Sequence, residues 1–211
     1  MVKVKICGIT NWADAKTALD AGADALGFNF FPSSPRYIAP EDAGAIARRL
    51  PRSVSAVGVF VDETVENMLE ISRVAALDLV QMHGDESPEL LQRFRRRYLV
   101  IKAVQVRSGF RPACLVEYGD AAAFLLDGFH SRLRGGTGKT FDWNIAREAK
   151  RYGAVILAGG ITPENVGRAI REVEPFGIDV SSGVEARPGK KDPRKVRALM
   201  RAVELAQRKI A

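Results

Sequence analysis

The stretch VKVKICGITNWADAKTALDAGADALGFNFF, residues 2–31, contains one complete strand–helix–strand unit. Residues 2–9 and 25–31 are short apolar runs of the kind that forms strands buried on both faces. Between them, residues 14–22 carry apolar side chains at helical spacing and end on a glycine, which suits the C-terminus of a helix. The stretch therefore predicts a βαβ unit, the building block of a parallel sheet.

The same alternation continues along the rest of the chain. Six further apolar runs occupy residues 56–61, 77–82, 99–106, 122–126, 154–158 and 177–180. Helical periodicity follows at 41–50, 64–75, 88–97, 143–152, 163–172 and 193–209, whereas Gly109 and Pro112 interrupt it between 107 and 119. Eight units of roughly 25 residues predict a single (β/α)8 TIM barrel with few insertions, because an open sheet of this length would have fewer strands. We expect one catalytic domain over residues 1–211.

The composition indicates in which cellular compartment this domain is expected. Of 211 residues, 46% are hydrophobic, yet no apolar run approaches the roughly 20 residues that span a bilayer. The N-terminus lacks the long apolar region of a secretory signal. These features predict a cytoplasmic protein with no membrane contact. Cys7 and Cys114 form no CxxC pair, so we expect two reduced thiols.

The net charge of +7 raises the question of an anionic partner. A basic chain attracts nucleic acid, a membrane surface or a small anionic ligand. The basic clusters at 93–97 and 194–209 have the pattern of solvated helix faces. A nucleic-acid binder would need aromatic residues interleaved with its cations, but the phenylalanines fall mostly in the predicted strands. We expect a small anionic ligand and no nucleic acid, and keep the nucleic-acid binder as the alternative.

The active site of a (β/α)8 barrel lies at the carboxyl ends of its strands. In the first strand, Val4 and Ile6 would pack under the helices, which leaves Lys5 and Cys7 facing the barrel interior. Cys7 is then expected to point into the barrel mouth. The other polar or glycine positions at predicted strand ends are Asn29, Asp62, His83, Gln105, Asp127, residues 159–160 and residues 181–183.

Two glycine-rich turns follow the last two predicted strands, where phosphate-binding barrels hold their anion. In the first, Thr162 is expected to cap a helix that Pro163 begins. Backbone N–H groups and helix dipoles at such turns bind oxyanions, although ordinary strand–helix connectors have similar composition. Their joint position favours a phosphate site made of Gly159, Gly160, Ser181, Ser182 and Gly183.

Several motifs, in order along nearly the whole chain, resemble the phosphoribosylanthranilate isomerase family of tryptophan biosynthesis. They are KICGIT at 5–10, GFNFFPSSPRY at 27–37, QMHGDE at 81–86, LLD at 125–127, GGTGKTFDW at 135–143 and the two glycine turns. The resemblance implies an intramolecular oxidoreductase that converts N-(5-phosphoribosyl)anthranilate to 1-(2-carboxyphenylamino)-1-deoxyribulose 5-phosphate by an Amadori rearrangement. It implies a phosphosugar substrate, general acid–base catalysis, no cofactor and no metal.

The resemblance also assigns roles to individual residues. Cys7 matches the family's general base, Asp127 its general acid and Arg36 the position that holds the anthranilate carboxylate. The two glycine turns match its phosphate site. Lys5 lies on the same face of the strand as Cys7 and is expected to lower the pKa of that thiol. Asn29 and His83 are expected to border the site. The sequence departs from the family's usual pattern at Met82, at Ile161-Thr162 and at residues 128–130, and none of these is a catalytic position.

Other interpretations of these residues remain open. Taken alone, Cys7 also fits a small buried hydrophobe, Asp127 a helix cap and His83 a structural histidine. A related barrel, the aminoaldose isomerase of histidine biosynthesis, performs similar chemistry with two aspartates, and Cys7 argues against it. The loop at 130–140 fits a lid or a flexible connector. The sequence does not determine the oligomeric state, and a homodimer is one option.

Overall fold

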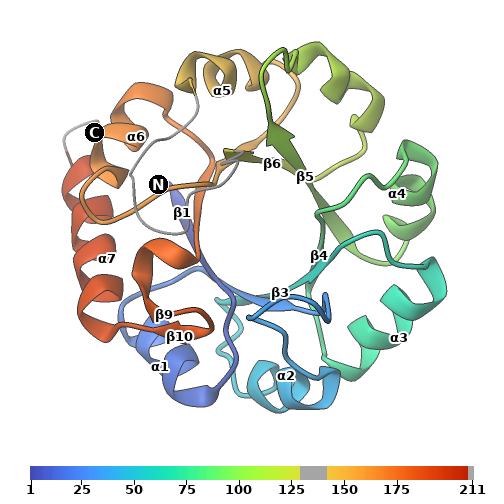
Figure 1. The fold of residues 1–211 in the computed structure, drawn as a ribbon, viewed down its shortest axis with the longest axis horizontal. Helices are drawn as coiled ribbons and strands as arrows, with labels where there is room; N and C mark the ends of the chain where they lie inside the picture. The colour runs from blue at the N-terminus through green and yellow to red at the C-terminus, as the bar shows by residue number, and fades with distance from the viewer. Residues whose placement is uncertain (129–141, 209–211) are drawn as a thin grey trace.

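Eight parallel strands close into a barrel, which confirms the predicted (β/α)8 fold (Figure 1). The computed structural model describes residues 1–128 and 142–208. Each strand pairs with the next one along the chain, and β8 pairs with β1 to close the barrel. The strands are β1 (Lys3–Cys7), β2 (Ala25–Asn29), β3 (Ser55–Phe60), β4 (Leu79–Met82), β5 (Leu99–Val106), β6 (Ala123–Gly128), β7 (Val155–Leu157) and β8 (Gly177–Val180).

Helices surround the barrel on its outside (Figure 1). The fifth position holds a 3-10 helix, η1 (Pro112–Tyr118), in the segment where Gly109 and Pro112 interrupt the helical periodicity. The α-helices are α1 (Trp12–Asp20), α2 (Pro40–Ala47), α3 (Val65–Val74), α4 (Pro88–Phe94), α5 (Trp143–Ala149), α6 (Val166–Val173) and α7 (Pro193–Gln207).

The predicted start of the helix at 163–172 is wrong. We expected Thr162 as its cap and Pro163 as its first residue, but α6 begins at Val166. Asn165 explains the difference, since its side chain donates to the Gly160 carbonyl at 2.8 Å and accepts from the Thr162 N–H at 2.9 Å. These two bonds close a separate turn before the helix begins, and that turn keeps the 159–160 backbone at the barrel mouth.

Side chains alternate along the strands as the parity argument predicts. Val4 and Ile6 are fully buried in the layer between strands and helices. Lys5 and Cys7 point to the other face, where Lys5 bonds to Asp179 inside the barrel. A second apolar cluster fills the interior below them and consists of Val57, Ile101, Ala103, Ala123, Leu125, Ile156 and Ala158. The barrel is therefore a packed core with polar side chains at one end.

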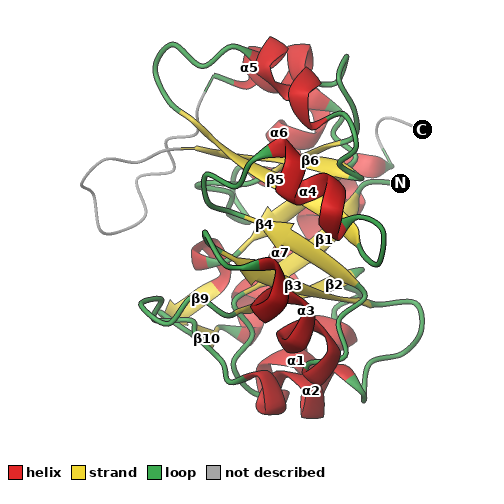
Figure 2. Ribbon diagram, turned by 90° about the vertical axis from the view of Figure 1, so that its right-hand side faces the viewer, coloured by secondary structure: helices red, strands yellow, loops and turns green. Residues whose placement is uncertain are grey.

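A small hairpin follows β8. The short helix η2 (Ser182–Val184) leads into β9 (Glu185–Arg187), which pairs antiparallel with β10 (Lys190–Lys191). Figure 2 shows this hairpin at one end of the barrel and the N-terminus at the other. Because parallel strands all end on the same side, the hairpin lies at the carboxyl end, where the site is expected.

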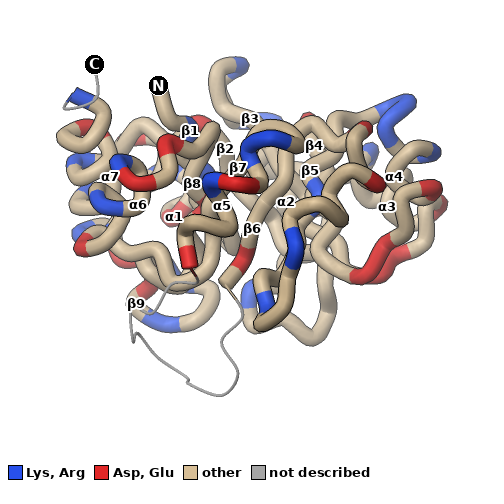
Figure 3. The backbone as a smooth tube through the Cα atoms, turned by 90° about the horizontal axis from the view of Figure 1, so that it is seen from above, with Lys and Arg blue, Asp and Glu red and all other residues tan. Residues whose placement is uncertain are grey.

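The basic cluster at 93–97 lies on a solvated helix face, as predicted. Arg93 and Arg95 are exposed and pair with Glu66 and Asp120. In the view from above, Lys and Arg alternate with Asp and Glu over the helices (Figure 3). Within residues 1–128 and 142–208, no helix is long and apolar enough to cross a membrane. The loop at 130–140, for which the sequence left a lid and a flexible connector open, falls outside the described residues.

Candidate active site

A cavity of about 200 Å³ lies at the carboxyl ends of the strands. It brings together every residue of the predicted site except Lys5, although these residues come from six different strand–helix units. Those residues are Cys7, Asn29, Arg36, His83, Asp127, Gly159, Gly160, Ser181, Ser182 and Gly183. The remaining lining residues, none of which was an expected site residue, are Val59, Gln81, Ala158, Ile161, Asp179 and Val180.

Cys7 ends β1 and is almost fully buried in the cavity wall. Its Sγ lies 2.8 Å from the position that a Cβ on Gly27 would take, and Lys5 Cε lies 3.0 Å from the same point. The thiol and the lysine are therefore neighbours. Burial raises the pKa of Cys7, and Lys5 opposes this rise without cancelling it. The expected influence of Lys5 is present, but burial outweighs it.

Lys5 and Asp179 form a buried ion pair next to the thiol. Lys5 Nζ lies 2.8 Å from Asp179 Oδ1, and both side chains are below 10% exposure. Burial alone would lower the pKa of Lys5, but attraction to Asp179 and Cys7 outweighs it and raises that pKa. Lys5 is thus a fixed cation beside Cys7. The missed residue Asp179 had a sequence signal, since it is a carboxylate inside the apolar run 177–180.

Asp127 lies near the end of β6 with His83 beside it. His83 Nε2 is 3.4 Å from Asp127 Oδ2, while Gln81 Nε2 is 2.8 Å from His83 Nδ1. The Gln81 amide therefore holds the imidazole ring by Nδ1, and Nε2 is the ring nitrogen that faces Asp127. Both interpretations of His83, as a structural histidine and as a residue at the border of the site, therefore apply: its ring is hydrogen-bonded within the fold and also lines the cavity.

Two other strand-end positions do not line this cavity. Asp62 Oδ1 accepts from the Asp85 N–H at 2.6 Å, and Gln105 Oε1 accepts from Arg107 at 2.6 Å. Both side chains organise their own loops. In the described part of the chain, no group of three or more His, Cys, Asp or Glu is arranged to hold a metal ion.

The two glycine turns lie against each other. Gly159 and Gly160 have φ of +72° and +68°, a backbone region that glycine adopts without strain. A Cβ on Gly183 would overlap the Ile161 carbonyl oxygen. The hydroxyl of Ser181 is buried and has no hydrogen-bond partner among the described residues. The turns thus form one polar, close-packed backbone surface on the cavity.

Arg36 is engaged in a way that the sequence did not predict. Its Nε and Nη2 donate to the two carboxylate oxygens of Glu185 at 2.8 and 2.7 Å. Glu185 also accepts from Lys191 Nζ at 3.0 Å. A glutamate two residues after the 181–183 turn was the only available signal, because the pairing joins residues 149 positions apart.

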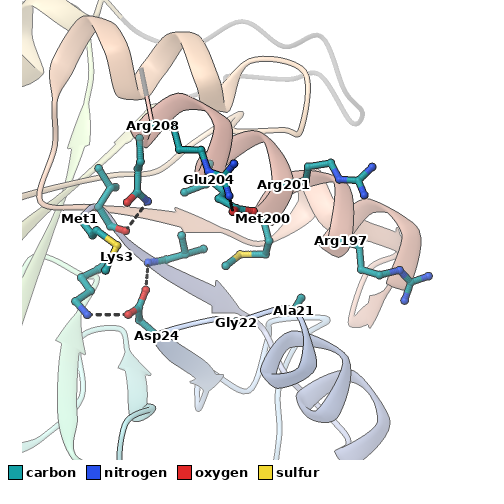
Figure 4. Close-up of a pocket in the computed structure, with 14 residues that line it drawn as sticks. Met1, Lys3, Ala21, Gly22, Asp24, Arg197, Met200, Arg201, Glu204 and Arg208 are labelled. Atoms are coloured by element: carbon teal, nitrogen blue, oxygen red, sulfur yellow. Dashed lines mark hydrogen bonds and ion pairs between the residues drawn. The ribbon is translucent and has the colours of Figure 1, made fainter. Parts of the chain in front are cut away.

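A larger cavity of about 660 Å³ lies elsewhere, between α7, β1 and the turn before β2 (Figure 4). Several of its polar side chains are paired: Lys3 bonds Asp24, Arg208 bonds Glu204 and Gln207 bonds the Val2 carbonyl. It is next to the start of β1, away from the strand ends that carry barrel chemistry. Volume alone therefore does not identify the active site.

The fold and the cavity at the carboxyl ends of its strands place the chain in the class of (β/α)8-barrel enzymes. The family model described as N-(5'phosphoribosyl)anthranilate (PRA) isomerase matches residues 4–202, and the chain belongs to this family. The family resemblance seen in the sequence motifs is confirmed.

Individual relatives cover nearly the whole chain. The chain is 52% identical over 204 residues to the N-(5'-phosphoribosyl)anthranilate isomerase of Trichlorobacter lovleyi, covering 95% of this chain and 97% of that protein. The crystal structure of phosphoribosyl anthranilate isomerase from Thermotoga maritima has a TM-score of 0.89 at 45% identity, covering 97% of this chain and 99% of that one.

A further crystal structure holds a ligand. It is a phosphoribosyl anthranilate isomerase in complex with reduced 1-(o-carboxyphenylamino)-1-deoxyribulose 5-phosphate, with a TM-score of 0.86 and 42% identity. It covers 97% of this chain and 99% of that chain.

Proposed function

We propose that the protein isomerises N-(5-phosphoribosyl)anthranilate to 1-(2-carboxyphenylamino)-1-deoxyribulose 5-phosphate, a step of tryptophan biosynthesis. The observation that carries the proposal is the family match over residues 4–202, together with the meeting of Cys7 and Asp127 in one cavity. The test is direct. Purified protein should consume the substrate, followed by the fluorescence of its anthranilate group, and absence of turnover would overturn the proposal.

The first half of the proposed reaction needs an acid. Asp127 donates a proton to the ring oxygen of the furanose, the C1–O bond breaks, and the amino nitrogen shares the charge as an iminium. The Asp127 side chain is 31% exposed, so the substrate can reach it from the cavity. As the proton leaves, the carboxylate that forms faces Nε2 of His83, and a proton on this nitrogen stabilises the negative charge.

The second half needs a base. The iminium makes the proton on C2 acidic, and the Cys7 thiolate removes it to give an enolamine. A proton then returns at C1 while the C2 hydroxyl becomes a carbonyl, so the aldose becomes a ketose with no net redox change. The rearrangement requires no cofactor: Asp127 gives one proton and Cys7 takes one, and the enolamine then gains one proton at C1 and loses one from the C2 hydroxyl.

We assign the substrate phosphate to the turns at 159–160 and 181–183. Three observations support this assignment: the close approach of the two turns, the glycine backbone and the unpaired Ser181 hydroxyl. The position of the two turns in the barrel also supports the assignment, because the phosphate site of barrel enzymes is formed by the loops after strands seven and eight. Part of the net positive charge of the chain then serves an anionic substrate.

Gly183→Ala is expected to weaken substrate binding and the fold together. The new methyl overlaps the Ile161 carbonyl, which forces the two turns apart at a cost of about 1–3 kcal/mol. KM should rise at least about tenfold because the turns no longer fit one phosphate group, an effect of the size of one lost charge-assisted contact. Steady-state kinetics and thermal unfolding measure the two effects.

Gly167→Ala in α6 is the matched control. The tightest contact of a Cβ there is 3.3 Å to the flexible end of Arg171, its other neighbours lie at ordinary van der Waals distance, and alanine favours a helix. Its KM should be unchanged. An unchanged KM in Gly183→Ala would argue against the phosphate assignment.

Lys5→Met is expected to move the pH dependence of catalysis upward. Removing the cation that opposes the effect of burial raises the pKa of Cys7 further. Because the reaction needs the thiolate, the acidic limb of the kcat/KM profile should shift to higher pH. Ultraviolet absorbance of the thiolate, titrated in a Cys114→Ser background, reads the same shift directly. An unchanged titration would make Lys5 a barrel-filling residue only.

Four further expectations remain predictions. They are a single catalytic domain, a cytoplasmic location, the absence of nucleic-acid binding and a homodimer as one option for the assembly. Salt-sensitive RNA binding that persists without Cys7 and Asp127 would favour the alternative function.

A further inference from the structure

The Arg36–Glu185 pair has a fixed geometry at the edge of the cavity. The carboxylate of Glu185 takes the Nε–Nη2 edge of the guanidinium in a bidentate contact. Glu185 is almost fully buried, with a side chain 4% exposed, whereas that of Arg36 is 24% exposed and lines the cavity. The contact therefore holds the arginine from behind and leaves part of it open to a ligand.

A guanidinium has a second edge for carboxylate recognition. Its five N–H donors are arranged in a rigid plane, and only the Nε–Nη2 edge is used by Glu185. The Nη1–Nη2 edge can donate two hydrogen bonds to a second carboxylate in the same plane. Since the plane is fixed by Glu185, the direction from which that carboxylate binds is fixed as well.

The charge of Glu185 does not cancel that of Arg36, because Lys191 also pairs with Glu185. Lys191 is fully buried, and its Nζ lies 3.0 Å from Glu185 Oε1. Two cations and one carboxylate leave one positive charge, which a substrate carboxylate would balance. The same Nζ donates to the Ser181 carbonyl at 3.3 Å, so this group is joined to the 181–183 turn.

The hairpin that carries these residues is anchored to the barrel. Asp14 of α1 accepts from the Lys191 backbone N–H at 2.9 Å and pairs with Lys190 at 2.7 Å. Thr10 donates to the Gly189 carbonyl at 2.8 Å. Glu185 is thus held by a support that does not depend on Arg36.

We infer that Glu185 is a positioning residue, which orients the free edge of Arg36 toward the carboxylate of the substrate and thereby selects an ortho-carboxylated aromatic amine. Through Lys191 it also sets the place of this carboxylate relative to the 181–183 turn. The inference rests on the proposed function, since it assigns the recognition of one end of that substrate.

Glu185→Gln tests the inference through a split between KM and kcat. The neutral amide cannot hold both guanidinium donors, so KM for phosphoribosylanthranilate should rise about tenfold, the scale of one charge-assisted hydrogen bond. The kcat at saturation should change less than about threefold, because neither proton transfer involves Glu185. The same variant is assayed on N-(5-phosphoribosyl)aniline, which lacks the carboxylate, where KM should not change.

Two controls separate orientation from general damage. Glu70→Gln removes an equivalent bidentate contact, in which Arg73 Nε and Nη2 donate to Glu70 at 3.1 and 2.6 Å on exposed α3. It should leave all constants unchanged. The second control is an Arg36→Lys background, which has no planar guanidinium for Glu185 to orient. There, Glu185→Gln should add little to the rise in KM that Arg36→Lys already causes.

The outcomes are distinct. Equal increases of KM for both substrates would make Glu185 a structural residue, and an unchanged or lower KM for the carboxylated substrate would show that it does not orient Arg36. Either result overturns the inference while wild-type turnover leaves the proposed function intact. If Glu185→Gln does not fold, Glu185→Asp keeps the charge near Lys191 but shortens the reach to Arg36, and the same selective rise in KM is required of it.

Discussion

Replacing Cys7 with serine is expected to lower kcat about 10³-fold, within the range that general acid–base groups contribute. A serine hydroxyl ionises far less readily than a thiol, so it cannot serve as the base at neutral pH. The change replaces one sulfur by one oxygen in a nearly buried position, and the barrel should accept it. Turnover of phosphoribosylanthranilate at saturating substrate measures the effect.

The second cysteine provides the control for this prediction. Cys114 lies exposed on η1, outside the cavity, and Cys114→Ser should leave kcat and KM as they are. A Cys7→Ser variant that folds, retains substrate binding and turns over at the wild-type rate would remove Cys7 from the mechanism. The family assignment would remain, since it rests on the match over residues 4–202.

The barrel could be predicted because its signals are local. Each buried parallel strand is a short apolar run and each helix has its own period, so eight repeats gave the closed architecture. Parity placed Lys5 and Cys7 on the interior face, and the structure agrees. The exception at Thr162 and Pro163 came from a side chain, Asn165, whose bonds to Gly160 and Thr162 are not visible in residue preferences.

The partners of the site residues could not be predicted in the same way. Arg36 and Glu185 are far apart in sequence and meet only because the hairpin after β8 folds over the mouth. The ion pair of Lys5 with Asp179 likewise joins the first and last strands. Motifs identify which residues are present, but the balance between burial and charge at Cys7 depends on these long-range contacts.

Replacing Asp127 with asparagine is expected to lower kcat by a similar factor, about 10³. The amide has nearly the same shape and keeps its place beside His83, but it has no acidic proton for the ring oxygen. Ring opening then becomes the slow step. Asp120→Asn, at an exposed aspartate that pairs with Arg95, is the matched control and should leave kcat unchanged.

An isotope effect distinguishes the two catalytic positions. With deuterium on C2 of the substrate, Cys7→Ser should show a large kinetic isotope effect, because removal of that proton limits its rate. Asp127→Asn should show an effect close to one, because the C2–H bond is intact while the ring opens. If the two variants give equal isotope effects, the acid and the base have not been assigned to the right side chains, even if both variants are slow.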